Sequence, residues 1–119
     1  MTAKSHSDHN ANRRRHERVD VDFHAQVKVY DKKSKKVGIL RQLARGGMML
    51  EPDRPFKSGR KEELIIVDES EHIRVLVRCI VRYGDMRRVG LEFEGLDANT
   101  AIDIGILMGK YYHRETIHP

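Results

Sequence analysis

The sequence predicts a mainly β fold, a small antiparallel barrel or sandwich with one helix at the C-terminus. Apolar and polar residues alternate with a period of two over several short segments, which is the pattern of strands with one buried face. Turn-forming residues interrupt these segments about every ten residues, as in small all-β domains. Near the C-terminus the apolar spacing changes to that of a helix. The length of 119 residues fits a single domain with a modest core.

The period of two is clearest in the first predicted strand, over residues 19–29. Apolar residues occupy its odd positions and polar residues its even positions. The charged segment 31–36 follows as a hairpin turn, and a second strand is predicted over residues 37–43. The glycine pair 46–47 then breaks the chain before a short apolar piece, residues 48–50.

Three further strands complete the predicted β structure. Residues 64–67 form a short buried strand, closed by an acidic turn. Residues 73–82 alternate again, with apolar side chains at odd positions and three arginines among the even ones. We expect those arginines, Arg74, Arg78 and Arg82, to lie on a solvated outer face. Residues 89–93 form the last strand.

The C-terminal helix is predicted to begin at Asp97 or Asn99, either of which can cap a helix, and to run to about Arg114. It carries too many apolar residues for a solvated helix, so we expect it to pack on the β structure. Gly105 and Gly109 lie four residues apart on one of its faces. Glycine lowers helix stability, so we expect this pair to permit close approach to a strand.

Composition narrows the class of protein. The net charge of +5 and the pI near 9.5 favour an anionic partner. The basic excess is local, because residues 13–18 hold four arginines whereas residues 92–103 hold four acids and neither Lys nor Arg. The single cysteine, Cys79, cannot form an intramolecular disulfide, and we expect it to be a small buried hydrophobe. Since nothing resembles a signal peptide or a membrane-spanning stretch, we expect a cytoplasmic protein without membrane insertion.

Four arginines stand directly before the first predicted strand, in the segment 13–18. A guanidinium group is a planar donor fork that binds phosphates and guanine edges through paired hydrogen bonds. A basic run can also be only a solvated arm that aids solubility. Because this run adjoins a rigid strand, we interpret it as an anion-binding clasp. The glycine pair 46–47 would let backbone come close to whatever the clasp holds.

The order of these two pieces resembles the PilZ domain, the bacterial receptor module for cyclic di-GMP. That family has Arg-x-x-x-Arg, then a strand, then Asp/Asn-x-Ser-x-x-Gly. Arg14 and Arg18 match the first motif, and Gln42, Ala44 and Gly47 stand at the three defined positions of the second, where only the glycine is kept. The resemblance spans nearly the whole chain. It implies a six- or seven-stranded antiparallel β-barrel with a C-terminal α-helix.

The resemblance also implies a binding site for cyclic di-GMP. Arg14 and Arg18 would grip its phosphates and guanines. Gln42 offers a carbonyl acceptor to a guanine edge, on a longer stem than Asp, whereas Ala44 offers nothing. Losing these polar contacts should weaken binding by roughly ten- to a few-hundredfold without changing the fold. The remaining candidate site residues are Gly47, Arg13, Arg15, Arg45, Gly46, Arg82 and Tyr83.

The chain accordingly divides into four segments. These are a leader over residues 1–12, expected to be disordered, an arginine-rich ligand arm over 13–18, the barrel and helix over 19–114, and a tail over 115–119. The family implies that ligand binding orders the arm against the barrel and so changes the surface offered to a partner protein. Motility, surface attachment and biofilm control are the outputs that it implies.

Two other functions stay open. The first is a PilZ-like adaptor with little or no nucleotide binding, which Gln42 and Ala44 favour and the intact arginine pair opposes. The second is a small nucleic-acid-binding barrel, which the charge allows, although the three Phe and four Tyr do not cluster as a stacking surface. We expect no enzyme and no cofactor, because no nucleophile elbow, P-loop or Gly-x-Gly-x-x-Gly sequence occurs. We also expect no metal site, because His6 and His9 of the leader are only two of the four ligands that a structural site needs.

Overall fold

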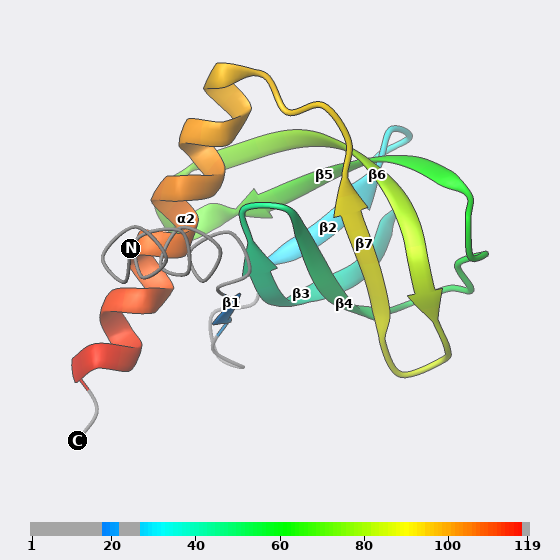
Figure 1. Cartoon of the computed structure of the whole chain (residues 1–119), viewed down its shortest axis with the longest axis horizontal. Coiled ribbons are helices and arrows are strands. Elements are labelled where there is room, and N and C mark those ends of the chain that lie inside the picture. Colours follow the sequence, from blue (N-terminus) through cyan, green and yellow to red (C-terminus); the bar gives the residue numbers. More distant parts are fainter. Residues whose placement is uncertain (1–17, 22–26, 118–119) are drawn as a thin grey trace, which may run out of the picture.

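The computed structural model describes residues 18–21 and 27–117, with side chains up to Tyr111. In this part of the chain a series of strands leads into one long helix (Figure 1). The strands are β1 (Arg18–Asp20), β2 (Lys28–Asp31), β3 (Lys36–Ala44), β4 (Gly47–Pro52), β5 (Lys61–Asp68), β6 (Ile73–Gly84) and β7 (Val89–Phe93). The 3-10 helix η1 (Glu69–Glu71) connects β5 to β6, and α2 (Ala98–Ile117) follows β7.

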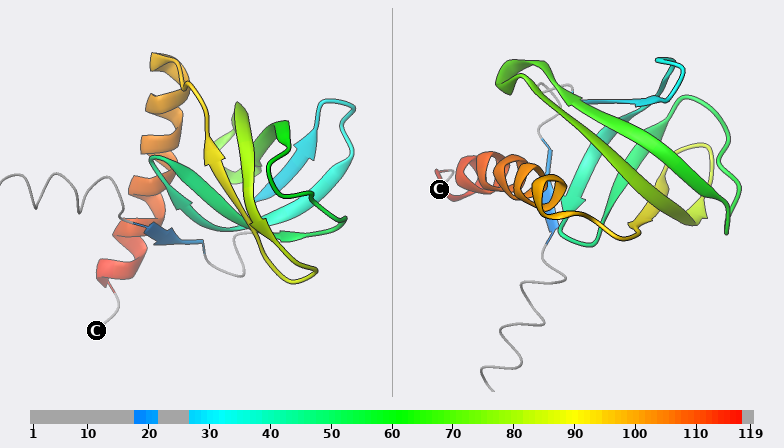
Figure 2. Two further views of the ribbon diagram at one scale, coloured as in Figure 1. Left: turned by 45° about the vertical axis from the view of Figure 1, so that its right-hand side comes forward. Right: turned by 90° about the horizontal axis from the view of Figure 1, so that it is seen from above.

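Six of these strands close into an antiparallel barrel. Along the wall the order is β3, β2, β5, β6, β7 and β4, and the pairing of β4 with β3 closes the circle. β1 pairs with the end of β3, on the edge that β2 also uses. Figure 2 shows the barrel in two further views, with β1 on the side where α2 packs. The predicted antiparallel barrel with a C-terminal helix is therefore confirmed.

The prediction of one continuous first strand is wrong. The backbone N–H of Val21 donates to Arg41, whereas the carbonyl of Val27 accepts from Leu40. Neighbouring residues of β3 thus bind positions that lie six apart in the chain, so the register cannot run through. Alternating polarity shows which face a residue presents, but it does not show that two stretches share one register. Residues 22–26 of the predicted strand lie outside the described part of the chain.

Alternation along the strands builds the core. In β6 the buried side chains are those of Val75, Val77, Cys79 and Val81. Arg74, Arg78 and Arg82 are exposed, as the period of two predicted. Cys79 is buried, which confirms the prediction that it is a small hydrophobic residue of the core. Its burial, together with the nearby charge of Glu62, raises the pKa of the thiol to about 12.

The helix α2 packs along the barrel against β6, β1 and β3 (Figure 1). The carboxylate of Asp97 accepts the backbone N–H of Thr100 at 2.8 Å, which selects Asp97 as the N-cap and holds its pKa below the ordinary value. The helix ends at Ile117, beyond the predicted end at Arg114. Its buried residues are Ile104, Leu107, Met108 and Tyr111. No helix in the part that the structure describes is long and apolar enough to cross a membrane.

The two helix glycines do not have the predicted role. A Cβ atom added at Gly105 or at Gly109 would meet nothing within 4 Å. Neither glycine therefore permits close approach to a strand. Gly105 lies three residues after Ile102, and Gly109 three residues after Ile106; these isoleucines are 59% and 50% exposed.

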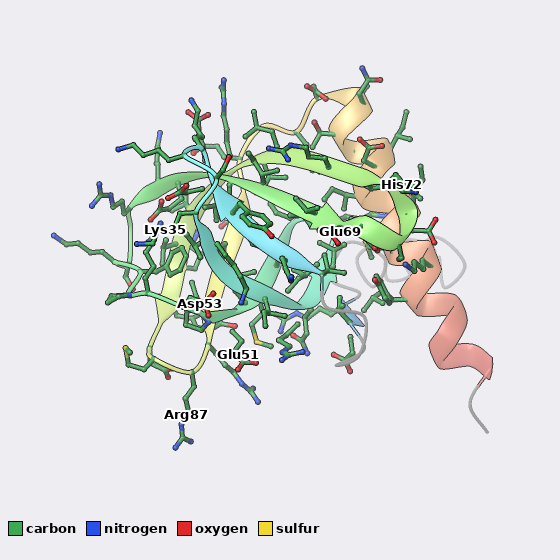
Figure 3. The ribbon with its side chains drawn as sticks, turned by 180° about the vertical axis from the view of Figure 1, so that it is seen from behind. Lys35, Glu51, Asp53, Glu69, His72 and Arg87 are labelled. Carbon is green, nitrogen blue, oxygen red and sulfur yellow. The ribbon has the colours of Figure 1, made fainter. Side chains whose placement is uncertain are left out.

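Asp68, the last residue of β5, ties α2 to the barrel. Its carboxylate accepts hydrogen bonds from the hydroxyl of Tyr111 at 2.9 Å, the ammonium of Lys110 at 3.1 Å and the hydroxyl of Ser70 at 2.7 Å. Burial alone would raise the pKa of Asp68, but these hydrogen bonds and the Lys110 charge hold it below the ordinary value. Figure 3 shows this end of the barrel, where Glu69 lies on the β5–β6 connection next to α2.

Candidate functional site

A cavity of about 480 Å³ opens on the outer face of the barrel, where β1, β3, β4, β6 and β7 come together. Its volume falls in the range of roughly 300–1,000 Å³ that is usual for small-molecule sites. It is lined by Arg18, Gln42, Leu43, Ala44, Gly46, Gly47, Met48, Met49, Arg82, Tyr83, Gly90, Leu91 and Glu92.

A bulge in β3 turns two of these side chains outward. The pairing with β4 steps from Leu40 to Gln42 while β4 advances by a single residue, so Arg41 is the extra residue. After the bulge Leu43 is buried, whereas Gln42 and Ala44 lie on the opposite face of the strand and line the cavity.

A second bulge, in β6, brings two adjacent residues to the same cavity. The pairing with β7 steps from Val81 to Tyr83 while β7 moves by one residue, from Leu91 to Gly90. Arg82 is therefore the extra residue, and both it and Tyr83 are exposed. A regular strand would have sent one of these two side chains into the core.

The ring of Tyr83 lies against the backbone of β7. Tyr83 and Gly90 are paired residues, and a Cβ atom at position 90 would overlap the ring. Tyr83 nevertheless remains 51% exposed and borders the cavity. The arrangement offers an aromatic surface of the kind on which nucleotide bases stack.

Gly47 is required by the barrel rather than by the turn. A Cβ atom there would overlap the backbone carbonyl oxygen of Leu91, whereas one at Gly46 would meet nothing within 4 Å. Neither glycine has a positive φ. We predicted that the Gly46–Gly47 pair lets backbone come close to a ligand. At Gly47 the structure shows instead that the missing side chain makes room for strand β7.

Gln42 is held by an aspartate that the sequence motifs did not single out. Asp20 on β1 lies directly opposite Gln42, and the Gln42 side-chain Nε2 donates to Asp20 Oδ1 at 2.9 Å. An ionised carboxylate only accepts hydrogen bonds, so the amide must turn its NH₂ group toward Asp20. That Asp20 faces Gln42 follows from the register between β1 and β3. The sequence did not predict that these two strands pair.

One of the two arginines in the cavity lining is already paired with a carboxylate. Arg82 donates to the carboxylate of Glu92, and this hydrogen bond and the opposite charge raise the pKa of Arg82 and lower that of Glu92. Arg18 forms no ion pair within the part of the chain that the structure describes. Arg18 is therefore the lining arginine whose charge is not already matched by a carboxylate in that part of the chain.

The predicted site residues are brought together only in part. Those that line the cavity are Arg18, Gln42, Ala44, Gly46, Gly47, Arg82 and Tyr83. Arg45 is exposed at the β3–β4 turn and is not among the lining residues. Arg13, Arg14 and Arg15 lie outside the described residues. The lining residues that no motif indicated are Leu43, Met48, Met49, Gly90, Leu91 and Glu92.

A larger and more open depression, of about 780 Å³, lies between the β2–β3 hairpin, the loop before β5 and strands β5 and β6. Three ion pairs join residues of its lining to one another, Lys32 with Glu63, Arg54 with Glu62, and Lys61 with Glu94. Much of its charge is compensated internally, so we place the candidate site at the smaller cavity.

The sequence matches the family model for the PilZ domain over residues 12–108. That match covers both segments in which the Arg-x-x-x-Arg and Gln42–Gly47 features occur. None of the curated proteins matches the sequence.

Several solved structures have a similar fold, two of them PilZ domains by name. The PilZ domain of YcgR from Escherichia coli, solved with c-di-GMP, has a TM-score of 0.71 and 11% sequence identity, over 87% of this chain and 94% of that one. The PilZ domain of CeSA from a cellulose-synthesising bacterium has a TM-score of 0.62 and 14% identity, over 82% and 99%. The inhibitor of motility MotI/DgrA of Bacillus subtilis has a TM-score of 0.62 and 23% identity, over 88% of this chain and 53% of that one.

Proposed function

The chain belongs to the PilZ domain family, and from that premise we propose that it is a receptor for cyclic di-GMP. The ligand is a dinucleotide with two negative phosphates and two guanines. A site for it needs fixed cations, acceptors for the guanine donors and a surface for stacking. YcgR and the PlzA protein of Borreliella burgdorferi, both similar in fold, were solved with c-di-GMP.

The observation that carries the proposal is the pairing of β1 with β3. It places Arg18 opposite Ala44, at the edge of the one cavity that Gln42 and Gly47 also line. The second arginine of the first motif and all three positions of the second motif thus meet in space, although more than twenty residues separate them in the chain.

Each part of the lining has a role in this proposal. Arg18, with Arg14 from the preceding segment, binds phosphate and the guanine edge through paired hydrogen bonds. Tyr83 offers its ring to a guanine, and Gln42 offers its carbonyl oxygen to guanine N–H groups. Arg82 can exchange Glu92 for a phosphate, since both residues are half exposed.

The altered second motif lowers the affinity that we expect. Ala44 supplies no hydroxyl, and Gln42 is neutral where the family's aspartate is charged. Hydrogen bonds contribute about 0.5–1.5 kcal/mol when neutral and about 1.5–3 when one partner is charged. We therefore propose binding in the micromolar range or weaker.

Signalling would follow from the arm. Residues 13–18 carry four arginines and adjoin β1, which lies on the cavity side of β3. A ligand held by these arginines and by the barrel would fix the arm on the outer face. The altered surface would then change the affinity for a partner protein, in motility, attachment or biofilm control within the cytoplasm.

Titration calorimetry with cyclic di-GMP tests the proposal. Arg14→Ala and Arg18→Ala should each weaken binding by about tenfold or more, because each removes charge-assisted hydrogen bonds. Arg74→Ala is the matched control: it removes the same charge from an exposed position of β6 outside the cavity lining and should leave the affinity unchanged. Unchanged affinity in both arm variants would remove the proposed clasp.

A second candidate is an adaptor that binds protein but little or no nucleotide. The carboxylate of Glu92 in the cavity lining favours it, because it already occupies Arg82 and repels phosphate. The same calorimetry separates the two, since the adaptor gives no heat with cyclic di-GMP. Single-stranded RNA, titrated at two salt concentrations, provides the comparison for a nucleic-acid-binding barrel.

A further inference from the structure

We propose that Asp20 is a positioning residue that fixes Gln42 as a hydrogen-bond acceptor and so sets a preference for guanine over adenine in the bound dinucleotide. The inference rests on the proposed function, because it concerns the same cavity. Asp20 belongs to neither of the two sequence motifs.

The geometry begins with the opposed pair on β1 and β3. Asp20 Oδ1 accepts from Gln42 Nε2 at 2.9 Å. An amide carries its donors and its acceptor on opposite branches of one planar group. With the nitrogen branch on Asp20, the carbonyl oxygen is the branch of the Gln42 amide that remains for a ligand in the cavity that Gln42 lines.

An amide without such a partner would not discriminate between the bases. It can turn over and offer its NH₂ group or its carbonyl oxygen as the ligand requires. The Watson–Crick edge of guanine presents two neighbouring donors, N1–H and the 2-amino group. Adenine presents an acceptor at N1 and no 2-amino group. A carbonyl oxygen held at this place therefore matches guanine and opposes adenine N1.

The pair also accounts for how a glutamine can serve where the family has a shorter residue. The longer side chain has one more rotatable bond, whose freedom would be lost on binding. Because Asp20 already holds the amide, part of that ordering precedes the ligand. The acceptor is then placed by two residues on neighbouring strands instead of by one.

The test compares cyclic di-GMP with cyclic di-AMP by calorimetry on the full chain. The wild-type protein should prefer cyclic di-GMP. Asp20→Ala should weaken cyclic di-GMP binding by about five- to tenfold and leave the affinity for cyclic di-AMP unchanged or higher. Asp20→Asn should reduce the preference only in part, because its amide can either accept from Gln42 Nε2 or turn over and donate to Gln42 Oε1, whereas the carboxylate only accepts.

A second readout does not depend on ligand. The side-chain NH₂ protons of Gln42 should exchange slowly with solvent in the wild type and rapidly in Asp20→Ala, as measured by NMR.

Each other result has one meaning. Wild-type selectivity in Asp20→Ala, or an equal loss for both nucleotides, overturns the inference and leaves the receptor function standing. An undiminished preference in Asp20→Asn shows that an acceptor-only partner is not needed to fix Gln42, which overturns positioning by the carboxylate. A wild-type protein that binds neither nucleotide refutes the proposed function and the inference together.

Discussion

Glycine suits position 90 because the ring of Tyr83 occupies the space where a side chain would begin. The same requirement has a different origin at position 47, where the neighbouring atom is a backbone oxygen of β7. A ring on a half-exposed side chain can rotate away, whereas a barrel strand cannot. Single residues around the cavity therefore differ in whether they serve the ligand surface or the barrel itself.

Gly90→Ala should displace the Tyr83 ring at little cost in stability, because the ring can move into solvent. We expect the free energy of unfolding in urea to fall by about 1 kcal/mol or less. If Tyr83 stacks on guanine, cyclic di-GMP binding should weaken by about five- to 150-fold, since base–aromatic stacking contributes about 1–3 kcal/mol. Gly105→Ala is the control, with free space at its Cβ, no positive φ and a position outside the cavity lining. Equal affinity in the two variants would exclude stacking on Tyr83.

At the scale of the elements, the sequence predicted the strands better than their irregularities. Alternation located β6 and β7, because every second residue there is apolar. It predicted neither the bulge at Arg41 nor the bulge at Arg82, because each bulge adds one charged residue beside other polar ones. The bulges nevertheless decide that Gln42, Ala44 and Tyr83 share a cavity. Register depends on partners distant in the chain, and polarity along one strand does not report it.

The helix glycines give a prediction at this scale. Gly105→Ala and Gly109→Ala should each raise the free energy of unfolding by about 0.5–1 kcal/mol, because alanine has the higher helix propensity and both sites have room for a methyl group. The two effects should add in urea denaturation of the double variant. A loss of stability in either variant would show that this face of α2 is packed in solution.

Across the whole molecule, the sequence alone indicated a small barrel or sandwich, and the family resemblance predicted the closed barrel. The sequence could not show which residues join the helix to the barrel. Asp68 belongs to the acidic turn predicted after residues 64–67, yet it is 1% exposed and accepts hydrogen bonds from Lys110 and Tyr111, more than forty residues later. The arm was predicted as the main part of the site, and only its last residue, Arg18, lies among the described residues.

The contact of Asp68 with Lys110 and Tyr111 predicts how the stability of the fold depends on pH. The pKa of Asp68 is lowered in the folded state from an ordinary value of 3.8. Its contribution is therefore present above about pH 4 and is lost as the pH falls through the lower, folded pKa. Asp68→Asn should cost about 1.5–3 kcal/mol at pH 7, measured by urea unfolding. The gap between variant and wild type should shrink below pH 4. A gap of constant size would mean that the charge of Asp68 does not stabilise the fold.

The buried thiol of Cys79 has a practical consequence. Reagents attack the thiolate, and with a pKa of about 12 only about one molecule in ten thousand carries it at pH 8. In the closed barrel Cys79 should therefore react very slowly with thiol reagents. Modification should occur when strands β5, β6 and β7 separate locally. Since the chain has one cysteine, the rate at which a thiol reagent modifies it reports how often the barrel opens locally. A bound nucleotide that bridges strands should make this modification slower.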